Sequence, residues 1–243
     1  MKKGFAITLV CCFFLSSCYK KDVDLPEIGL EYFPIDLGKF VEYKVDSVWQ
    51  DDPIGQIGSG EVHYLLRDVN ESSFTDEEGR QAIRVERSRK QKGEVFWNIK
   101  DVWHRVRTSF FAEQNEENVI FVKLRFPVKN EKAWDGNARN TWKSLQEIYK
   151  QNTVPQEWPY TCQNVHEPYT INGFTFDSTV TVLQIDRSAV FGLNVFAKEV
   201  YAKNVGLIHK EIRMYDVQTN PSSTTDTDSV GFSFEMVVTD FGS

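Results

Sequence analysis

The chain has 243 residues, of which 41% are hydrophobic and 14% aromatic, and its formal charge is −7. This composition can bury a real core, which excludes disorder for the bulk of the chain. The acidic balance argues against nucleic acid as a partner and against an electrostatic hold on anionic lipid, because both need clustered Lys and Arg.

The first eighteen residues have the pattern of an export signal. Lys2 and Lys3 precede an apolar run from Phe5 to Leu15, which is too short for the roughly 20 residues of a membrane-spanning helix. The run leads into Leu-Ser-Ser-Cys, an ending that resembles the lipobox of bacterial lipoproteins. The resemblance implies that residues 1–17 are removed as a signal peptide and that Cys18 receives the lipid.

Processing at Cys18 would leave 226 residues with 26 basic and 35 acidic side chains, a formal charge of −9. Two or three acyl chains anchor a protein stably where a single chain is marginal. Residue 19 is Tyr and not Asp, so the best-known inner-membrane retention signal is missing, and we expect the outer membrane. The Lys-Lys-Asp-Val-Asp that follows resembles a signal for export to the cell surface, although a solvated linker explains it equally well.

Residues 18–31 contain Pro26, Gly29 and several charges without a sustained period, and we predict a tether there. Residues 32–243 are expected to form a single β-rich domain. Cys11 and Cys12 lie in the discarded segment, so Cys162 is left alone and no internal disulfide can form in the mature chain. A spectator thiol is favoured over a nucleophile at this position.

From residue 33 onward, apolar residues alternate with polar ones, as in strands that bury one face. Turn signals such as Asn172-Gly173 separate the runs, as expected for antiparallel hairpins. We therefore predict a mainly β fold, with antiparallel strands in a sandwich or an open half-barrel. The predicted inward rows are Val41, Tyr43, Val45, Trp49; Val62, Tyr64, Leu66; Val95, Trp97, Ile99; Ile120, Val122, Leu124, Phe126; Phe174, Phe176, Val180, Val182; Ile208, Ile212, Met214; and Val230, Phe232, Phe234, Met236, Val238.

Charged residues between these rows are assigned to the solvated faces of the strands. Lys123 and Arg125 alternate with the row that begins at Ile120, so they are expected to point outward. The main basic cluster alternates with Glu86, which also suggests a solvated strand face; it consists of Arg84, Arg87, Arg89 and Lys90.

One segment has helical spacing, from Asn137 to Lys150, with apolar residues three and four positions apart. Residues 152–168 hold three prolines and are expected to form a long irregular excursion. Aromatic residues crowd into 134–160, and exposed aromatics on loops can grip a sugar ring or an apolar ligand. The candidate ligand-binding residues are therefore Trp134, Trp142, Trp158 and Tyr160, although a plug that closes one end of the β core is the favoured explanation.

Two stretches echo each other, Phe33–Val41 and Phe126–Trp134, which share Phe, Pro, a β-branched residue and Lys. A true duplication would divide the domain into two halves, 32–125 and 126–243, but four matches in nine positions also arise by chance.

The run Phe33–Tyr43 resembles the F-P-L-x-x-G-x-x-W-x-Y opening of a family of uncharacterised Gram-negative outer-membrane lipoproteins, with Val41 where Trp is usual. Tyr201–Ile208 is similar to the late aromatic-Ala-x-x-V-G-L-V segment of that family, with Asn204 where Gly is commoner. The resemblance implies a β-rich lipoprotein and carries no activity with it.

No motif in the chain indicates catalysis, a cofactor or a metal site. Nucleophile-elbow, P-loop and dinucleotide-binding patterns are missing from the sequence. The histidines are isolated, so metal binding would require them to converge on folding; they are His63, His104, His166 and His209.

We therefore expect a lipid-anchored lipoprotein that is not an enzyme and that binds a protein or a glycan. A glycan- or acyl-chain-binding lipoprotein with a carrier-like open barrel is the alternative, and a periplasmic hydrolase is less favoured. A binder predicts an aromatic cleft, a complex-forming protein predicts an exposed apolar patch, and a hydrolase predicts His104 or His166 beside a carboxylate in an open pocket.

Overall fold

The computed structural model describes residues 27–50, 59–140, 159–188, 192–219 and 227–243. Within these ranges the only helical element is a single 3₁₀ turn, η1 (Leu30–Tyr32). All other regular structure is strand: β1 (Phe40–Gln50), β2 (Gly60–Thr75), β3 (Gln81–Gln91), β4 (Asn98–Arg107), β5 (Phe111–Glu116), β6 (Val119–Arg125), β7 (Ala133–Asp135), β8 (Pro159–Ile171), β9 (Phe174–Arg187), β10 (Gly192–Ala202), β11 (Gly206–Thr219) and β12 (Thr227–Gly242).

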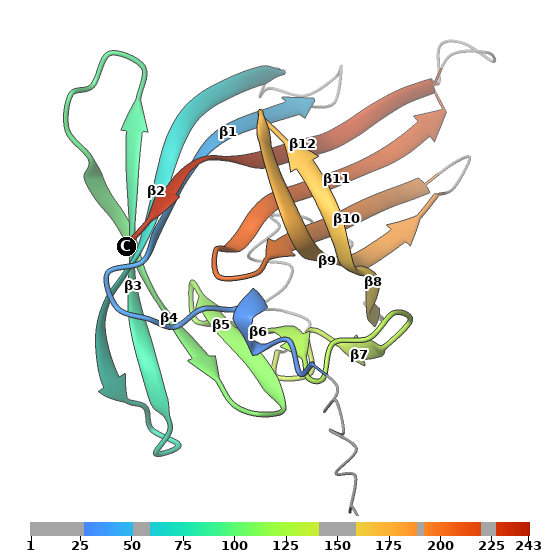
Figure 1. Ribbon diagram of the computed structural model, residues 1–243. Coiled ribbons are helices and arrows are strands. Elements are labelled where there is room, and N and C mark those ends of the chain that lie inside the picture. The colour runs from blue at the N-terminus through green and yellow to red at the C-terminus, as the bar shows by residue number, and fades with distance from the viewer. Residues whose placement is uncertain (1–26, 51–58, 141–158, 189–191, 220–226) are drawn as a thin grey trace, which may run out of the picture.

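The twelve strands form one antiparallel sheet in the order β6-β5-β4-β3-β2-β1-β12-β11-β10-β9-β8-β7. It consists of two six-stranded meanders, β1–β6 and β7–β12, joined where the first strand pairs with the last. Figure 1 shows this sheet curling round to make a nearly closed, barrel-like shape. The predicted mainly β, antiparallel fold is confirmed, in the barrel form. The two meanders occupy residues 40–125 and 133–242. The sequence duplication proposed for the halves 32–125 and 126–243 stays a prediction.

The two ends of the sheet meet along β6. The Val122 amide donates a hydrogen bond of 2.9 Å to the Gly136 carbonyl, just after β7. The Asn140 side chain accepts from the Ile120 amide at 2.9 Å and donates to the Ile120 carbonyl at 2.8 Å. Backbone groups on the edge of β6 are therefore satisfied by residues 136–140, which leaves less of that edge open for unwanted pairing.

Most of the predicted inward row of β1 and the end of that of β12 are core residues, since Tyr43, Val45, Met236 and Val238 are each exposed by 1% or less, but Trp49 of the β1 row is 38% exposed. Several other expectations about faces are wrong, including the solvated position expected for Arg89, which lies over the Tyr64 ring. Val95 and Ile99 are exposed by 78% and 62%, although they were assigned to the core. Lys123 and Arg87 were assigned to solvent, and both turn into the interior, where their side chains are only 4% and 11% exposed.

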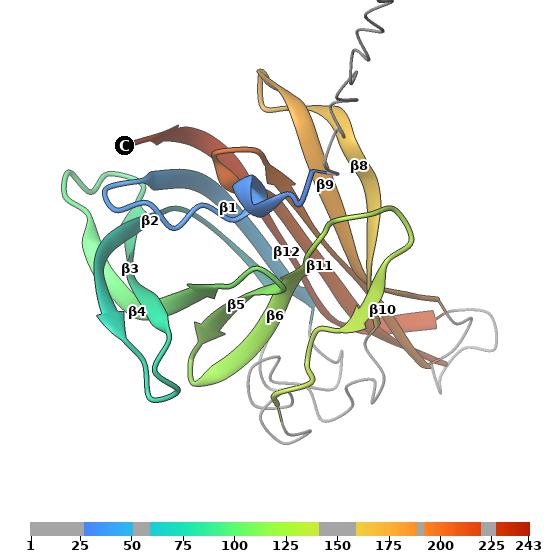
Figure 2. The ribbon, with the colours of Figure 1, turned by 60° about the horizontal axis from the view of Figure 1, so that its bottom comes forward.

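The segment that leads into β1 lies across one end of the curled sheet, from beside β9 toward β1 (Figure 2). Tyr32 and Phe33 are buried within the main apolar core. Arg107 of β4 donates hydrogen bonds of 3.0 Å to the carbonyls of both Leu30 and Phe33. We call residues 27–38 the strap. Residues 27–31 were predicted to belong to the tether, but Glu27, Ile28 and Glu31 contact Lys203, Val128 and Asn204, respectively, which lie next to the strands.

The predicted helix from 137 to 150 lies outside the described residues from position 141 onward. The first part of the predicted excursion, up to residue 158, lies outside them as well. Its last part, from Pro159, belongs to strand β8.

We expect the substitution Arg107→Met to loosen the strap, because two buried carbonyls would lose a charged donor. Hydrogen bonds to charged groups contribute about 1.5 to 3 kcal/mol each, so the loss of two is expected to lower the unfolding free energy, measured by urea denaturation, by about 3 to 6 kcal/mol. Arg213→Met, which changes a guanidinium that is 54% exposed, is the matched control. Equal effects of the two substitutions would contradict a fastening role for Arg107.

Candidate functional site

Charged side chains meet in the interior of the sheet, where a soluble β domain usually holds apolar ones. Lys123 of β6 is 2.8 Å from the Glu116 carboxylate and 2.9 Å from that of Glu199. Lys210 of β11 lies 3.3 Å from Glu199 and 3.8 Å from Glu116. The Tyr201 hydroxyl donates a hydrogen bond of 2.5 Å to the second oxygen of Glu199. Two carboxylates and two ammonium groups therefore neutralise one another across the interior.

A second set of charges continues this chain of contacts through Gln114. The Gln114 side chain donates to Glu116 at 2.8 Å and accepts from Arg105 at 2.7 Å. Asp68 lies 3.4 Å from Arg105 and accepts two hydrogen bonds, of 2.7 and 2.8 Å, from Arg87. We call the whole assembly the buried charge network: Asp68, Arg87, Arg105, Gln114, Glu116, Lys123, Glu199, Tyr201 and Lys210.

Ion pairs determine which side chains of the buried charge network are ionised. Burial alone would raise the pKa of Glu116 and of Glu199, but Lys123 and Lys210 outweigh it and hold both pKa values below the ordinary 4.5. Burial would likewise lower the pKa of Lys210, and Glu116 and Glu199 reverse that, so its pKa is raised. Both carboxylates and Lys210 are therefore charged at neutral pH. An acyl chain would have to displace these paired charges from the middle of the interior.

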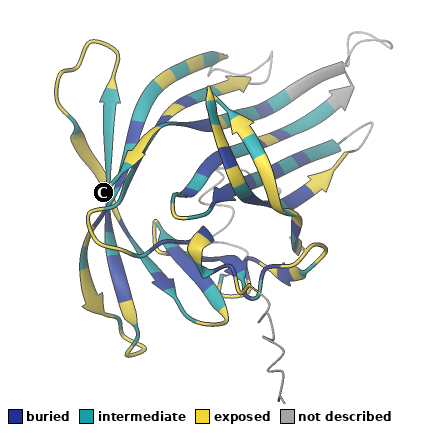
Figure 3. Ribbon diagram, viewed as in Figure 1, coloured by how far each residue is buried: buried dark blue, intermediate teal, exposed yellow. Residues whose placement is uncertain are grey.

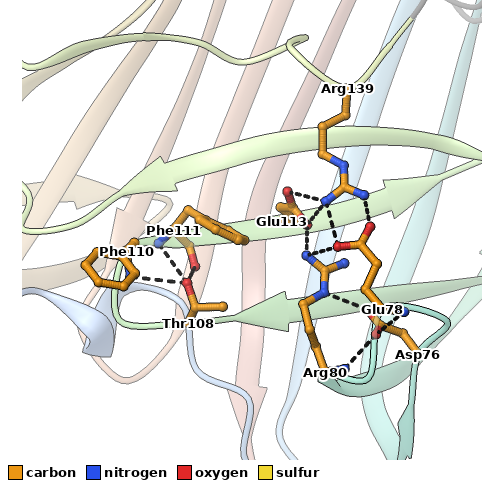
Figure 4. Close-up of polar contacts among 8 residues, drawn as sticks. All are labelled: Asp76, Glu78, Arg80, Thr108, Phe110, Phe111, Glu113 and Arg139. Carbon is orange, nitrogen blue, oxygen red and sulfur yellow. Dashed lines mark hydrogen bonds and ion pairs between the residues drawn. The ribbon is translucent and has the colours of Figure 1, made fainter.

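A second polar cluster fastens the chain after β7 to the β2–β3 turn (Figure 4). The Glu113 carboxylate, 6% exposed, lies 2.8 Å from Arg80 and 3.1 Å from Arg139. Arg80 also donates to Asp76 at 2.8 Å, and Arg139 pairs with Glu78. Each carboxylate in the cluster has a guanidinium partner, which fits a structural clamp better than a catalytic acid.

The candidate ligand-binding aromatics fall into two groups. Trp134 and Tyr160 are 9% and 1% exposed, with ring centroids 5.9 Å apart, and Trp134 donates a hydrogen bond of 2.7 Å to the Val122 carbonyl. Both side chains belong to the main apolar core and offer no open aromatic face, while the plug itself stays a prediction. Cys18, Trp142 and Trp158 lie outside the described residues.

The histidines do not assemble into a shared site. His104 packs edge-on against Phe74 in a surface hollow of about 480 Å³, and burial lowers its pKa. Asp76, in the same hollow, is held by Arg80. His63 is exposed and bound by Asp46 at 2.6 Å, whereas His209 is buried and lies 2.9 Å from the Tyr169 hydroxyl.

His166 belongs to the attachment of the strap. Its Nδ1 lies 2.8 Å from the Tyr32 hydroxyl, which is also 2.9 Å from the Ser178 hydroxyl. The Glu27 carboxylate is 3.7 Å from the same nitrogen and also pairs with Lys203. Cys162 is fully buried, and burial raises the pKa of its thiol to about 11, so it is protonated at neutral pH.

The exposed apolar residues gather where β3 turns into β4. Val95 and Phe96 are each 78% exposed and Ile99 is 62% exposed; we call these three residues the apolar tip. Figure 3 shows this turn as exposed along almost its whole length. Sequence reasoning misplaced it because alternation in Val95, Trp97 and Ile99 is the same whether a strand end covers a core or projects from it.

Lysines lie beside the apolar tip on the outer face of the sheet. Lys44, Leu65 and Lys90 are directly paired across β1, β2 and β3, so they share one face. Lys44, Lys90 and Lys92 line a groove of about 290 Å³, and we call them the lysine group. Lys90 also lies 4.8 Å above the ring of Trp97. The apolar tip and the lysine group together form the surface that we name the docking surface.

Comparison of the chain with models of known protein families, with curated proteins and with solved structures gives no match. In the part of the chain that the structure describes, no group of three or more His, Cys, Asp or Glu side chains could hold a metal ion. No helix within the described ranges is both long and apolar enough to pass through a bilayer.

We expect Glu199→Gln to be strongly destabilising, because it leaves Lys123 and Lys210 short of a counter-charge. Breaking a buried ion pair from one side costs about 3 to 5 kcal/mol. The control lies on the same two strands: Glu211 pairs with Lys198 at 3.1 Å, one register position away and on the outer face. Glu211→Gln should cost less than about 1 kcal/mol, and similar losses for the two variants in urea unfolding would refute the role of the network.

The lowered pKa values of Glu116 and Glu199 predict a stability that depends on acid pH. Unfolding restores the ordinary pKa near 4.5, so the unfolded chain binds more protons as the pH falls below that value. The contribution of Glu116 and Glu199 to the unfolding free energy should not change with pH above about pH 5.5. Below about pH 4.5 it should fall progressively as the pH falls. Urea titrations from pH 3 to 7 measure this, and Glu199→Gln should show a shallower acid slope than the parent; an equal slope would contradict the assignment.

Proposed function

We propose that this chain is a lipid-anchored lipoprotein of the outer membrane, on its periplasmic face or at the cell surface, with a non-catalytic docking role. The lipobox-like ending at Cys18 supports the anchor, which would fix the protein to the bilayer through its acylated amino terminus. Docking is supported by the apolar tip, whose side chains lie in solvent at the end of an ordered hairpin. An exposed apolar cluster of this kind, bordered by polar residues, is typical of interaction sites.

The observation that carries the docking role is the contrast between the exposed apolar tip and the charged side chains, which are paired with partners. Charged groups that chemistry would need are engaged with partners, in the buried charge network and around Glu113. The three residues of the apolar tip, by contrast, expose most of their surface. Apolar surface of this kind gains free energy when it is covered, at about 25 cal/mol per Å². The arrangement therefore favours binding over catalysis.

The anchor is tested by growing producing cells with labelled palmitate. The parent chain should incorporate label and remain in the membrane pellet after a high-salt wash. Cys18→Ala should incorporate none, because the thiol that accepts the lipid is gone. A parent chain that stays unlabelled would contradict the anchor.

Docking is tested by measuring how fast a water-soluble reagent reacts with the apolar tip in native membranes. In Phe96→Cys, a water-soluble maleimide should react at least tenfold more slowly in membranes than after detergent extraction, because the docked tip is covered. Phe110→Cys is the matched control: Phe110 is 69% exposed in a separate turn at the other end of β4, held by the Thr108 hydroxyl. The parent chain gives the background from Cys162, which is buried. Equal reaction at position 96 in both states would contradict a docking role.

A further inference from the structure

We infer that the partner of the docking surface is a bilayer that contains anionic phospholipid, an inference that rests on the proposed docking role. The apolar tip would enter the boundary between headgroups and acyl chains, and the lysine group would meet the headgroup phosphates. The domain would then have two attachments to one membrane, the lipid on Cys18 and the β3–β4 turn. The second attachment would set the orientation of the sheet.

The first support is that apolar and cationic residues lie together on this hairpin. Lys92 lies in the tight turn, which the Glu94 amide closes by a hydrogen bond of 3.1 Å to the Gln91 carbonyl. Val95 and Phe96 follow this turn, and Ile99 pairs with Ser88. Lys90 follows two residues after Ser88, on the same outer face, and pairs with Leu65. Apolar side chains and lysines therefore occupy the same end of this hairpin. Interfacial membrane binders bury an apolar face about 5 to 10 Å deep and keep Lys and Arg at headgroup level.

The second support is local charge. The processed chain carries a formal charge of −9, so most of its surface would be repelled by an anionic bilayer. Within the described ranges, none of the three lysines of the group forms an ion pair with a carboxylate. Asp46, which lines the same groove as the lysines, is bound by His63, and Glu94, next to the turn, accepts from the Gln91 amide at 2.7 Å. The negative net charge of the chain argued against electrostatic binding to anionic lipid. It does not describe the local surface where the three lysines of the lysine group lie together.

The third support is the type of cation. Protein–protein interfaces are depleted of Lys and enriched in Arg, because a lysine ammonium is strongly hydrated and its flexible stem is costly to fix. The three cations that line the groove are all Lys, whereas Arg87 turns inward onto Asp68, Arg89 lies over the Tyr64 ring and Arg67, on the outer face, is paired with Glu42 at 3.5 Å. Lysines near a charged membrane surface act through long-range attraction and need no fixed geometry, each contributing about fivefold in binding.

The test uses the acylated protein, purified from producing cells and reconstituted in vesicles of phosphatidylcholine alone or with one third phosphatidylglycerol. Phe96→Cys carries a fluorophore whose emission rises in apolar surroundings. We expect its emission to shift to the blue on the anionic vesicles and to be quenched there by brominated acyl chains. The same fluorophore at Phe110→Cys should report water on both vesicles. Lys92→Glu, added to the labelled chain, should lower the docked fraction at least fivefold, and Lys129→Glu, an exposed lysine away from the surface, should not.

The outcomes separate this inference from the proposed function. If the protein floats with the vesicles while position 96 reports water on both, the bilayer is not the partner, although maleimide protection in native membranes would still support docking to a protein. Equal insertion on neutral and anionic vesicles would contradict the role of the lysine group. A protein that does not float with either vesicle would overturn the anchor and the bilayer contact together.

Discussion

Paired charges in the interior, together with apolar clusters that draw residues from both meanders, connect the two halves of this sheet. The two meanders share backbone pairing at β1 and β12 and close only partly along β6. Across the space between them, Lys123 of the first meander meets Glu199 of the second, and Glu116 of the first lies within 3.8 Å of Lys210. Removing these groups from water is expensive, and the expense is offset only because every carboxylate has a cation within reach.

The strap and the seam along β6 depend on this central arrangement. Arg105, which joins Asp68 to Gln114, and Arg107, which holds the strap carbonyls, lie two residues apart on β4 and therefore on the same face. Glu113 and Gln114 are neighbours on β5, so the outer clamp and the inner network share one strand. Each contact orders a strand that takes part in another contact, so these interactions fix a large, curved sheet whose one cysteine within the described residues, Cys162, is free.

Much of the fold follows from alternation along the chain, which predicted antiparallel strands and the core rows around Tyr43 and Met236. The faces of Lys123 and Arg87 did not follow, because a charged residue between apolar ones looks the same whether it meets solvent or a buried partner. That partner, Glu199 for Lys123, is 76 positions away along the chain. For the candidate site, the sequence predicts Cys18, which stays a prediction, and no pattern could distinguish Val95 and Ile99 in an exposed turn from the same residues in a core strand.

We assign different roles to the curled sheet and to the exposed β3–β4 turn. Buried charges hold the sheet in its curled form, which presents the β3–β4 turn in a fixed place beside the lysine group. The measurement that tests this account most directly is a double-mutant cycle between Lys123→Met and Glu199→Gln, followed by urea unfolding. We predict a coupling energy above about 2 kcal/mol, because the two groups are mutual partners in the interior. A coupling below about 0.5 kcal/mol would show that the two side chains act independently and would contradict the account.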